Sequence, residues 1–240
     1  MMNKEERRQK RLEKAPKAKW LYRFVKIIGW LPMNVLFPTK VYGNRKLDKK
    51  KVIIAMNHLS AIDPLMIAHK FSPSVYFMAK GDFMKKPVIS WFLNHLGCIF
   101  VRRGEPDINA AKRAFGVLES GKALGVFPEG TRNKNDDGSF LRFKTGVAYF
   151  AIKAEAPIVP MVIDRKLRFF RKNSLIIGDE IDMSEFYCEN PGKDALAGAT
   201  RKLQNEMQRL RRELDELNGR KAEAVTPSEN ETPAQQGVTQ

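Results

Sequence analysis

Short apolar segments alternate with helix-forming segments through the middle of this chain, and that alternation limits the folds open to it. The apolar segments predict strands at 51–56, 74–79, 98–101, 123–127, 158–163 and 174–177. Between several of them the sequence predicts helices at 61–70, 86–96, 108–119 and 147–153. Strands alternating with helices are typical of layered α/β domains. We therefore expect an α/β fold with a mixed, mostly parallel sheet that is flanked by helices.

The two ends of the chain differ from this middle part. Near the C-terminus, apolar residues recur at the spacing of an amphipathic helix: Leu196, Ala199, Leu203, Leu210, Leu214 and Leu217. That helix could pack on the core or form a short coiled-coil seam. Residues 219–240 carry almost no large apolar side chains and are expected to be disordered. The predicted organisation is a basic arm and helical element at 1–38, the α/β domain at 39–218 and a tail at 219–240.

Residues 20–38 carry apolar side chains at helical spacing, directly after a basic arm at 1–19. The segment also holds Trp and Tyr, which favour a membrane–water interface. The pattern predicts a pair of interfacial helices bent at Pro32, and the alternative is an amphipathic helix that packs on the core. Charged residues interrupt the apolar run, so a transmembrane helix is not expected, and the charged start does not resemble a signal peptide.

The formal net charge of +16 favours an anionic partner, which could be nucleic acid, an anionic membrane or a charged substrate. The sequence has no zinc-finger spacing and no aromatic-basic RNA signature, so a nucleic acid partner is not expected. The two cysteines, Cys98 and Cys188, match neither a metal-ligand spacing nor a disulfide framework. They fit a reducing cytosolic setting, and we expect no metal site.

His58 and Asp63 follow the predicted strand at 51–56, where α/β sheets commonly bind ligands. A neutral imidazole can act as a general base, and a carboxylate can orient its ring. Residues five apart do not share a helix face, so a turn must bring the pair together. The alternative is a loop histidine beside a capping aspartate. Because the sequence has no G-x-S-x-G motif, a base here would activate a hydroxyl of the substrate.

Cationic side chains follow two further predicted strands. Arg102 and Arg103 come after 98–101, and a second group follows 123–127: Glu129, Gly130, Thr131, Arg132 and Lys144. The planar guanidinium group suits phosphate, and a glycine allows the backbone to approach a ligand. The glutamate could order the arginines or bond a substrate hydroxyl. The alternative is a turn that carries solvated charges.

The order of these segments, NHLSAID, FVRR, FPEGTR and IVP, resembles the lysophosphatidic acid acyltransferase family of glycerolipid acyltransferases over roughly residues 40–165. The resemblance implies that His58 is the general base and Asp63 its partner. It implies that Arg103 contacts the phosphate of the acceptor. It also assigns acceptor binding to Glu129, Gly130, Thr131 and Arg132.

The same resemblance names secondary positions. Lys80 and Lys144 are candidates for phosphate contacts, and Val159 and Pro160 match a block associated with the acyl donor and the shape of the site. Many family members carry an acidic residue at the position of Arg102, so this departure bears on the identity of the acceptor.

The implied reaction moves a fatty acyl group from acyl-CoA or acyl carrier protein to the sn-2 hydroxyl of 1-acyl-glycerol 3-phosphate, giving phosphatidic acid. The donor is a co-substrate, and no cofactor is expected. Expected partners are this lysophosphatidic-acid-like acceptor, the donor and an anionic membrane surface. The expected location is the cytoplasmic face of the cell membrane, peripheral or monotopic. Alternatives are acylation of glycerol 3-phosphate or another lysolipid, and a non-catalytic basic protein that binds membrane or nucleic acid.

Overall fold

The computed structural model describes residues 24, 27–44, 51–70, 75–102, 107–135 and 138–220. The predictions for the basic arm at 1–19 and for the tail beyond residue 220 lie outside this range. Gly219 and Arg220 are described, and the Arg220 side chain contacts the domain, two residues past its predicted end at 218.

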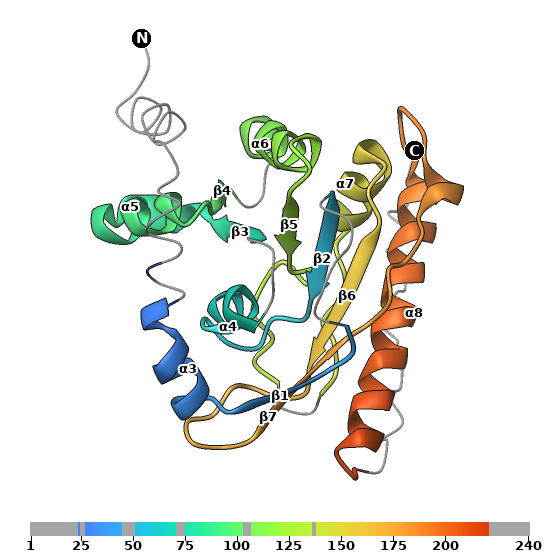
Figure 1. Ribbon diagram of the computed structural model, residues 1–240. Helices are drawn as coiled ribbons and strands as arrows, with labels where there is room; N and C mark the ends of the chain where they lie inside the picture. Colours follow the sequence, from blue (N-terminus) through green and yellow to red (C-terminus); the bar gives the residue numbers. More distant parts are fainter. Residues whose placement is uncertain are drawn as a thin grey trace, which may run out of the picture.

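Seven strands form one mixed sheet in the order β1-β7-β6-β2-β5-β3-β4 (Figure 1). Their bounds are β1 Thr39–Tyr42, β2 Val52–Met56, β3 Val75–Lys80, β4 Ile99–Val101, β5 Ala123–Val126, β6 Ile158–Ile163 and β7 Asn173–Ile177. All neighbouring strands are parallel except β6 and β7. Since β1 is parallel to β7, these two strands run opposite to the other five. The predicted mixed, mostly parallel sheet is confirmed.

Helices cover both faces of the sheet. The helices with fully described bounds are α3 Trp30–Leu36, α4 Asp63–Lys70, α5 Pro87–His95, α6 Ile108–Glu119, α7 Gly146–Ala154 and α8 Lys193–Leu217, with short 3-10 turns η1 Gly81–Lys85 and η2 Ser184–Phe186. In β2, Ile53 and Ala55 join the core with α6, α7 and α8, while the alternate residues join the core beneath α3 and α4. A strand covered on both faces must be apolar along its whole length, which explains the uninterrupted run VIIAM.

Helix α8 packs along the sheet. Its buried residues lie in the core with α6 and α7: Ala199, Leu203, Met207, Leu210 and Leu214. The core-packing alternative for the C-terminal helix is therefore the observed one. These positions are one or two helical turns apart, so they form a single apolar stripe.

The sequence did not predict β1. Its four residues, TKVY, are partly exposed and pair only with β7 at the edge of the sheet. A short, half-polar edge strand lacks the apolar run that signals a buried one.

The predicted bend at Pro32 is wrong. Residues 27 and 28 are helical, Gly29 forms a turn, and α3 runs from Trp30 through Pro32. Proline is tolerated in the first turn of a helix because the N–H groups there have no intrahelical acceptor. No helix among the described residues is long and apolar enough to cross a membrane.

Candidate active site

The candidate site lies at the edge of the sheet where β2, β5 and β6 end. These strands are parallel neighbours, so their carboxyl ends meet at one edge. In Figure 1 this edge lies toward α4 and the β1–β7 pair. His58 follows β2 by two residues, and the segment with Phe127 and Glu129 follows β5.

A tight turn brings Asp63 back to His58. Nδ1 of His58 lies 3.0 Å from Oδ2 of Asp63. The same oxygen accepts the backbone N–H groups of Leu59 at 2.8 Å and Ser60 at 2.7 Å. Because Oδ2 accepts, Nδ1 carries the proton and Nε2 keeps its lone pair. This is the arrangement that a histidine general base requires.

The pair is shielded unequally from solvent. Asp63 is fully buried, whereas the His58 side chain keeps 16% of its exposure. The other oxygen, Oδ1 of Asp63, has no hydrogen-bond partner among the described residues. The imidazole can therefore be reached from solvent, whereas its carboxylate partner cannot.

Phe127 forms one wall beside the imidazole. Its ring stacks on His58 with centroids 4.0 Å apart and an interplanar angle of 22°. Phe77 from β3 stacks on Phe127 in turn, at 6.1 Å. The imidazole plane is therefore fixed by a hydrogen bond at one nitrogen and by an aromatic face. In the sequence, Phe127 was identified only as the first residue of the FPEGTR motif, and this role was not predicted for it.

Glu129 connects the two strand ends. Its Oε1 accepts the backbone N–H of His58 at 3.0 Å, and its Oε2 accepts that of Leu141 at 2.9 Å. The residue is 2% exposed, and burial raises the pKa of its carboxyl group while the two N–H groups lower it. These contacts hold His58 in place. The assignment of Glu129 to acceptor binding stays a prediction.

The loop that follows Glu129 lies against the same edge. Gly130 has φ of +65°, and a Cβ built on it would lie 2.9 Å from Cδ of Lys144. The backbone N–H of Asn133 donates to the carbonyl oxygen of His58 at 2.7 Å. Thr131, Arg132 and Lys144 are exposed. The structure therefore brings this loop to His58 and leaves cationic side chains accessible beside it.

The other predicted residues are placed less directly. Lys80 ends β3, is half exposed and forms an ion pair with Asp82. Arg102 is exposed and its backbone N–H donates to Asp107 at 3.0 Å, while Arg103 lies outside the described residues. Val159 and Pro160 are buried within β6. Their predicted roles remain untested.

Asn57, directly after β2, joins the end of that strand to β6. It was not predicted as a site residue from the sequence. Its side chain donates to the carbonyl oxygen of Ile163 at 3.0 Å and accepts the N–H of Ile163 at 2.9 Å. Its place at the start of the NHLSAID motif, directly after a predicted strand, is the sequence signal that could have identified it. Among the described residues, no group of His, Cys, Asp or Glu is arranged to hold a metal ion.

The domain presents a histidine–carboxylate pair and accessible cations at one edge of its sheet. This arrangement is typical of an enzyme that acts on anionic substrates. A family model described as acyltransferase matches residues 38–164, more than half of the 240 residues. The chain therefore belongs to the acyltransferase family and is an enzyme of that class.

Named relatives and a solved structure agree with this membership. The 1-acyl-sn-glycerol-3-phosphate acyltransferase of Borreliella burgdorferi is 34% identical over 181 residues, covering 69% of this chain and 70% of that relative. The enzyme of the same name from Saccharomyces cerevisiae is 30% identical, and the match covers 70% of this chain but 58% of the relative. The crystal structure of the 1-acyl-sn-glycerophosphate (LPA) acyltransferase PlsC from Thermotoga maritima matches with a TM-score of 0.60 and 25% identity, covering 93% of this chain and 86% of that chain.

Proposed function

We propose that the chain transfers a fatty acyl group from a thioester to the sn-2 hydroxyl of 1-acyl-glycerol 3-phosphate, giving phosphatidic acid. The observation that carries this proposal is the hydrogen bond between His58 Nδ1 and Asp63 Oδ2, which leaves Nε2 available as a base. The names of the relatives favour lysophosphatidic acid as the acceptor over glycerol 3-phosphate or another lysolipid.

In the proposed reaction, Nε2 of His58 removes the proton of the acceptor hydroxyl as its oxygen forms a bond to the thioester carbonyl carbon. The carbon–sulfur bond then breaks, and the imidazolium returns the proton to the departing sulfur. A positioned base contributes roughly 10²–10⁴-fold in rate. Asp63 stabilises the imidazolium without being consumed, as in other histidine–carboxylate pairs.

Cationic side chains at the same edge supply the acceptor site in this proposal. Arg132 and Lys144 are exposed beside the His58 loop, and Arg103 follows β4 in the sequence. A phosphate bound by such groups would orient the hydroxyl toward Nε2, and holding two reactants together can lower the barrier by several kcal/mol. The donor is acyl-CoA or acyl carrier protein, both anionic thioesters that suit a chain of net charge +16.

The test measures thiol release from palmitoyl-CoA with and without oleoyl-lysophosphatidic acid. We expect the wild type to release thiol only with the acceptor, and folded His58→Ala to lose about 10²-fold or more of that rate. Retained turnover in His58→Ala would remove the base assignment. A panel with glycerol 3-phosphate and other lysolipids, and acyl carrier protein as donor, identifies the preferred pair. Wild-type protein inactive with all of them would leave a non-catalytic membrane- or nucleic-acid-binding role.

Arg103→Ala tests the phosphate assignment in the same assay. We expect it to raise the KM for lysophosphatidic acid more than it lowers kcat, because the contact forms before the chemical step. An unchanged KM would exclude Arg103 from the phosphate site.

A further inference from the structure

The loop between β6 and β7 is rich in cations and aromatic side chains, and the proposed reaction uses none of its residues. Its sequence from 165 to 172 is RKLRFFRK, with five Arg or Lys among eight residues and no acidic residue. Phe169 is 60% exposed and Phe170 is 71% exposed. Lys166, Arg168, Arg171 and Lys172 are exposed as well. We refer to residues 165–172 as the basic-aromatic loop.

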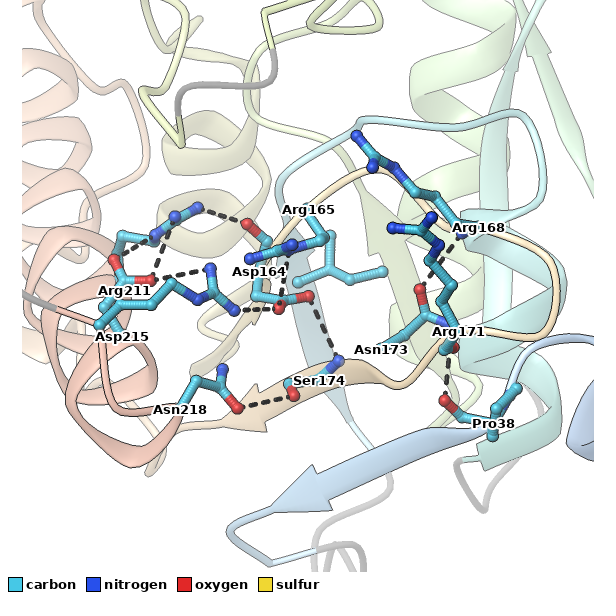
Figure 2. Close-up of polar contacts among 12 residues, drawn as sticks. Pro38, Asp164, Arg165, Arg168, Arg171, Asn173, Ser174, Arg211, Asp215 and Asn218 are labelled. Atoms are coloured by element: carbon cyan, nitrogen blue, oxygen red, sulfur yellow. Dashed lines mark hydrogen bonds and ion pairs between the residues drawn. The ribbon is translucent and has the colours of Figure 1, made fainter.

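The fold holds this loop in a defined conformation. The buried side chain of Asn173 accepts the backbone N–H of Arg168 at 3.3 Å and donates to the carbonyl oxygen of Arg171 at 2.8 Å (Figure 2). Phe170 has a positive φ of 55°, which is unfavourable for a bulky residue. Its exposed ring is therefore maintained by the surrounding contacts at a cost in backbone energy, as is common at functional positions.

The loop is joined to α3. The backbone N–H of Phe170 donates to the carbonyl oxygen of Leu36 at 2.7 Å. The rings of Phe37 and Phe169 lie 4.7 Å apart. In Figure 1, α3 and the β6–β7 connection lie at the same end of the molecule. The loop and the end of α3 therefore form a continuous surface.

Helix α3 and the residues before it add exposed apolar side chains to that surface. Leu31 is 62% exposed and Val35 53%, and their spacing of four places them along one face of α3. Ile27, which precedes the turn at Gly29, is 71% exposed. Monomeric soluble proteins rarely leave such a patch uncovered unless it binds a partner or a membrane. Within Trp30–Leu36 there is no charged residue, so the cations of the surface come from the loop.

The charge and the apolar side chains of this surface together indicate one kind of binding partner. Cations beside exposed aromatic and aliphatic side chains match a bilayer, with anionic head groups at its surface and acyl chains beneath. We propose that the basic-aromatic loop adds a second element to the membrane contact expected of the N-terminal helices, so that the loop and the exposed face of α3 form one docking surface for an anionic lipid bilayer at the His58 edge of the sheet.

The position of the loop relative to His58 supports this inference, which rests on the proposed function only in that the acceptor is a lipid. The loop begins one residue after β6, whose last residue, Ile163, is bonded in both directions to the side chain of Asn57. Asn57 precedes His58 in the chain. A bilayer bound at the loop would thus lie at the same edge of the sheet as the base, where a lipid head group could reach it.

Vesicle flotation of the full chain tests the electrostatic part of the proposal. The loop variant carries Arg168→Gln, Arg171→Gln and Lys172→Gln. The matched control carries Lys112→Gln, Lys122→Gln and Lys193→Gln, three exposed lysines outside the loop. On vesicles that contain phosphatidylglycerol, we expect the loop variant to bind about 100-fold more weakly than wild type, since each cation near an anionic bilayer contributes about fivefold. The control should bind far more tightly than the loop variant. Equal losses in the two variants would overturn the proposal.

Phe170→Asn tests the apolar part. Asparagine tolerates positive φ, so the loop conformation is preserved while the ring is lost. We expect about tenfold weaker binding to vesicles of phosphatidylglycerol or of phosphatidylcholine alone, because one buried ring is lost from the bilayer. Ile108→Asn is the control, since Ile108 is 67% exposed on α6, at the other end of the molecule in Figure 1. Unchanged binding of Phe170→Asn would contradict insertion of the loop. A wild-type chain that binds no vesicle would overturn the docking surface and favour a protein partner for it.

An activity comparison separates this inference from the proposed function. With a short-chain acceptor dissolved as monomers, the loop variant should turn over like wild type. With the acceptor embedded in phosphatidylglycerol vesicles, its rate should fall. Equal rates for wild type and loop variant on both forms of acceptor would overturn the docking surface. A wild type inactive on every acceptor would refute the proposed function, and flotation would still decide the docking surface.

Discussion

Asp63 combines an orienting contact with a structural one. Its Oδ2 accepts from His58 Nδ1 and from the backbone N–H groups of Leu59 and Ser60, all within 3.0 Å. Because the carboxylate is fully buried, the two N–H groups have no water to replace it. His58 is partly exposed, and its side chain does not hold a comparable set of buried backbone N–H groups. The two residues should therefore differ in stability effects while sharing the loss of activity.

We predict that Asp63→Ala abolishes acceptor-dependent thiol release and lowers the free energy of unfolding by about 2 kcal/mol or more, since each orphaned N–H costs about 1–3 kcal/mol. His58→Ala should abolish release and change the unfolding free energy by less than about 1 kcal/mol. Urea denaturation of the two variants beside wild type measures the difference. Equal losses of stability would show that the turn does not depend on the carboxylate.

Glu129 makes stability depend on pH. Burial raises the pKa of its carboxyl group above the ordinary 4.5. A group with a raised pKa in the folded state binds its proton more tightly when folded, so its stabilising contribution is complete below the ordinary pKa and is lost as the pH rises through the raised value. Glu129→Gln cannot titrate. We predict that the unfolding free energy of wild type relative to Glu129→Gln is higher at about pH 4 than at about pH 7, as measured by urea denaturation. The opposite slope would contradict the raised pKa.

The turn after β5 depends on the backbone freedom of one glycine. Gly130 adopts a left-handed conformation, its N–H donates to the carbonyl oxygen of Phe127 at 3.0 Å, and Lys144 packs against it. The N–H of Lys144 donates to the carbonyl oxygen of Pro128 at 2.9 Å. The turn thus fixes Lys144 and the loop after Glu129 as one unit beside His58.

We predict that Gly130→Ala lowers the unfolding free energy by about 1–2 kcal/mol, the cost of a left-handed L-residue, and raises the KM for the acceptor by displacing Lys144. Gly116→Ala is the matched control. Gly116 lies inside α6 with open space around it, so the same change should stabilise the protein by about 0.5–1 kcal/mol. Thermal melting and steady-state kinetics of both variants provide the measurement. If Gly130→Ala changed neither the unfolding free energy nor the KM, the turn would not depend on glycine at this position.

A charged network fastens α8 to the end of the sheet near the candidate site (Figure 2). Arg211 donates to the backbone oxygen of Asp164 at 2.7 Å and to the carboxylate of Asp215 at 2.8 Å. Arg220 bonds the carboxylates of both Asp164 and Asp215. Asp164 follows β6 and leads into the basic-aromatic loop. The network therefore ties the C-terminal helix to the strand end that carries the proposed docking surface.

We predict that Arg211→Ala lowers the unfolding free energy by about 1–3 kcal/mol, because the buried backbone oxygen of Asp164 loses its donor while Arg220 still bonds both carboxylates. Arg209→Ala is the control on the same helix. Arg209 bonds Glu206 and Glu213 but its side chain is half exposed, so about 0–1 kcal/mol is expected. Guanidinium denaturation of both variants tests this difference. Similar effects would show that burial of the network contributes little.

Much of the fold follows from local patterns. Six of the seven strands were predicted because buried strands are apolar runs, and α8 was predicted from its stripe of leucines. The edge strand β1 has neither signal. The antiparallel pairing of β6 and β7 agrees with their connection at residues 164–172, which is too short for the crossover that parallel neighbours need.

Contacts at the strand ends likewise include some that local sequence predicts and others that it does not. His58 and Asp63 are five residues apart and follow one strand, so their pairing could be proposed from a single segment. The bond from Glu129 to His58 spans 71 residues and that from Arg211 to Asp164 spans 47. Contacts of this kind form only after the strands assemble, and the residues that make them have no periodicity to reveal them. The exposure of Phe169 and Phe170 is likewise a property of the assembled chain, since an aromatic pair in a sequence ordinarily indicates a core. Local physics therefore fixes the elements and the chemical groups, and packing between distant segments fixes which groups meet and which face outward.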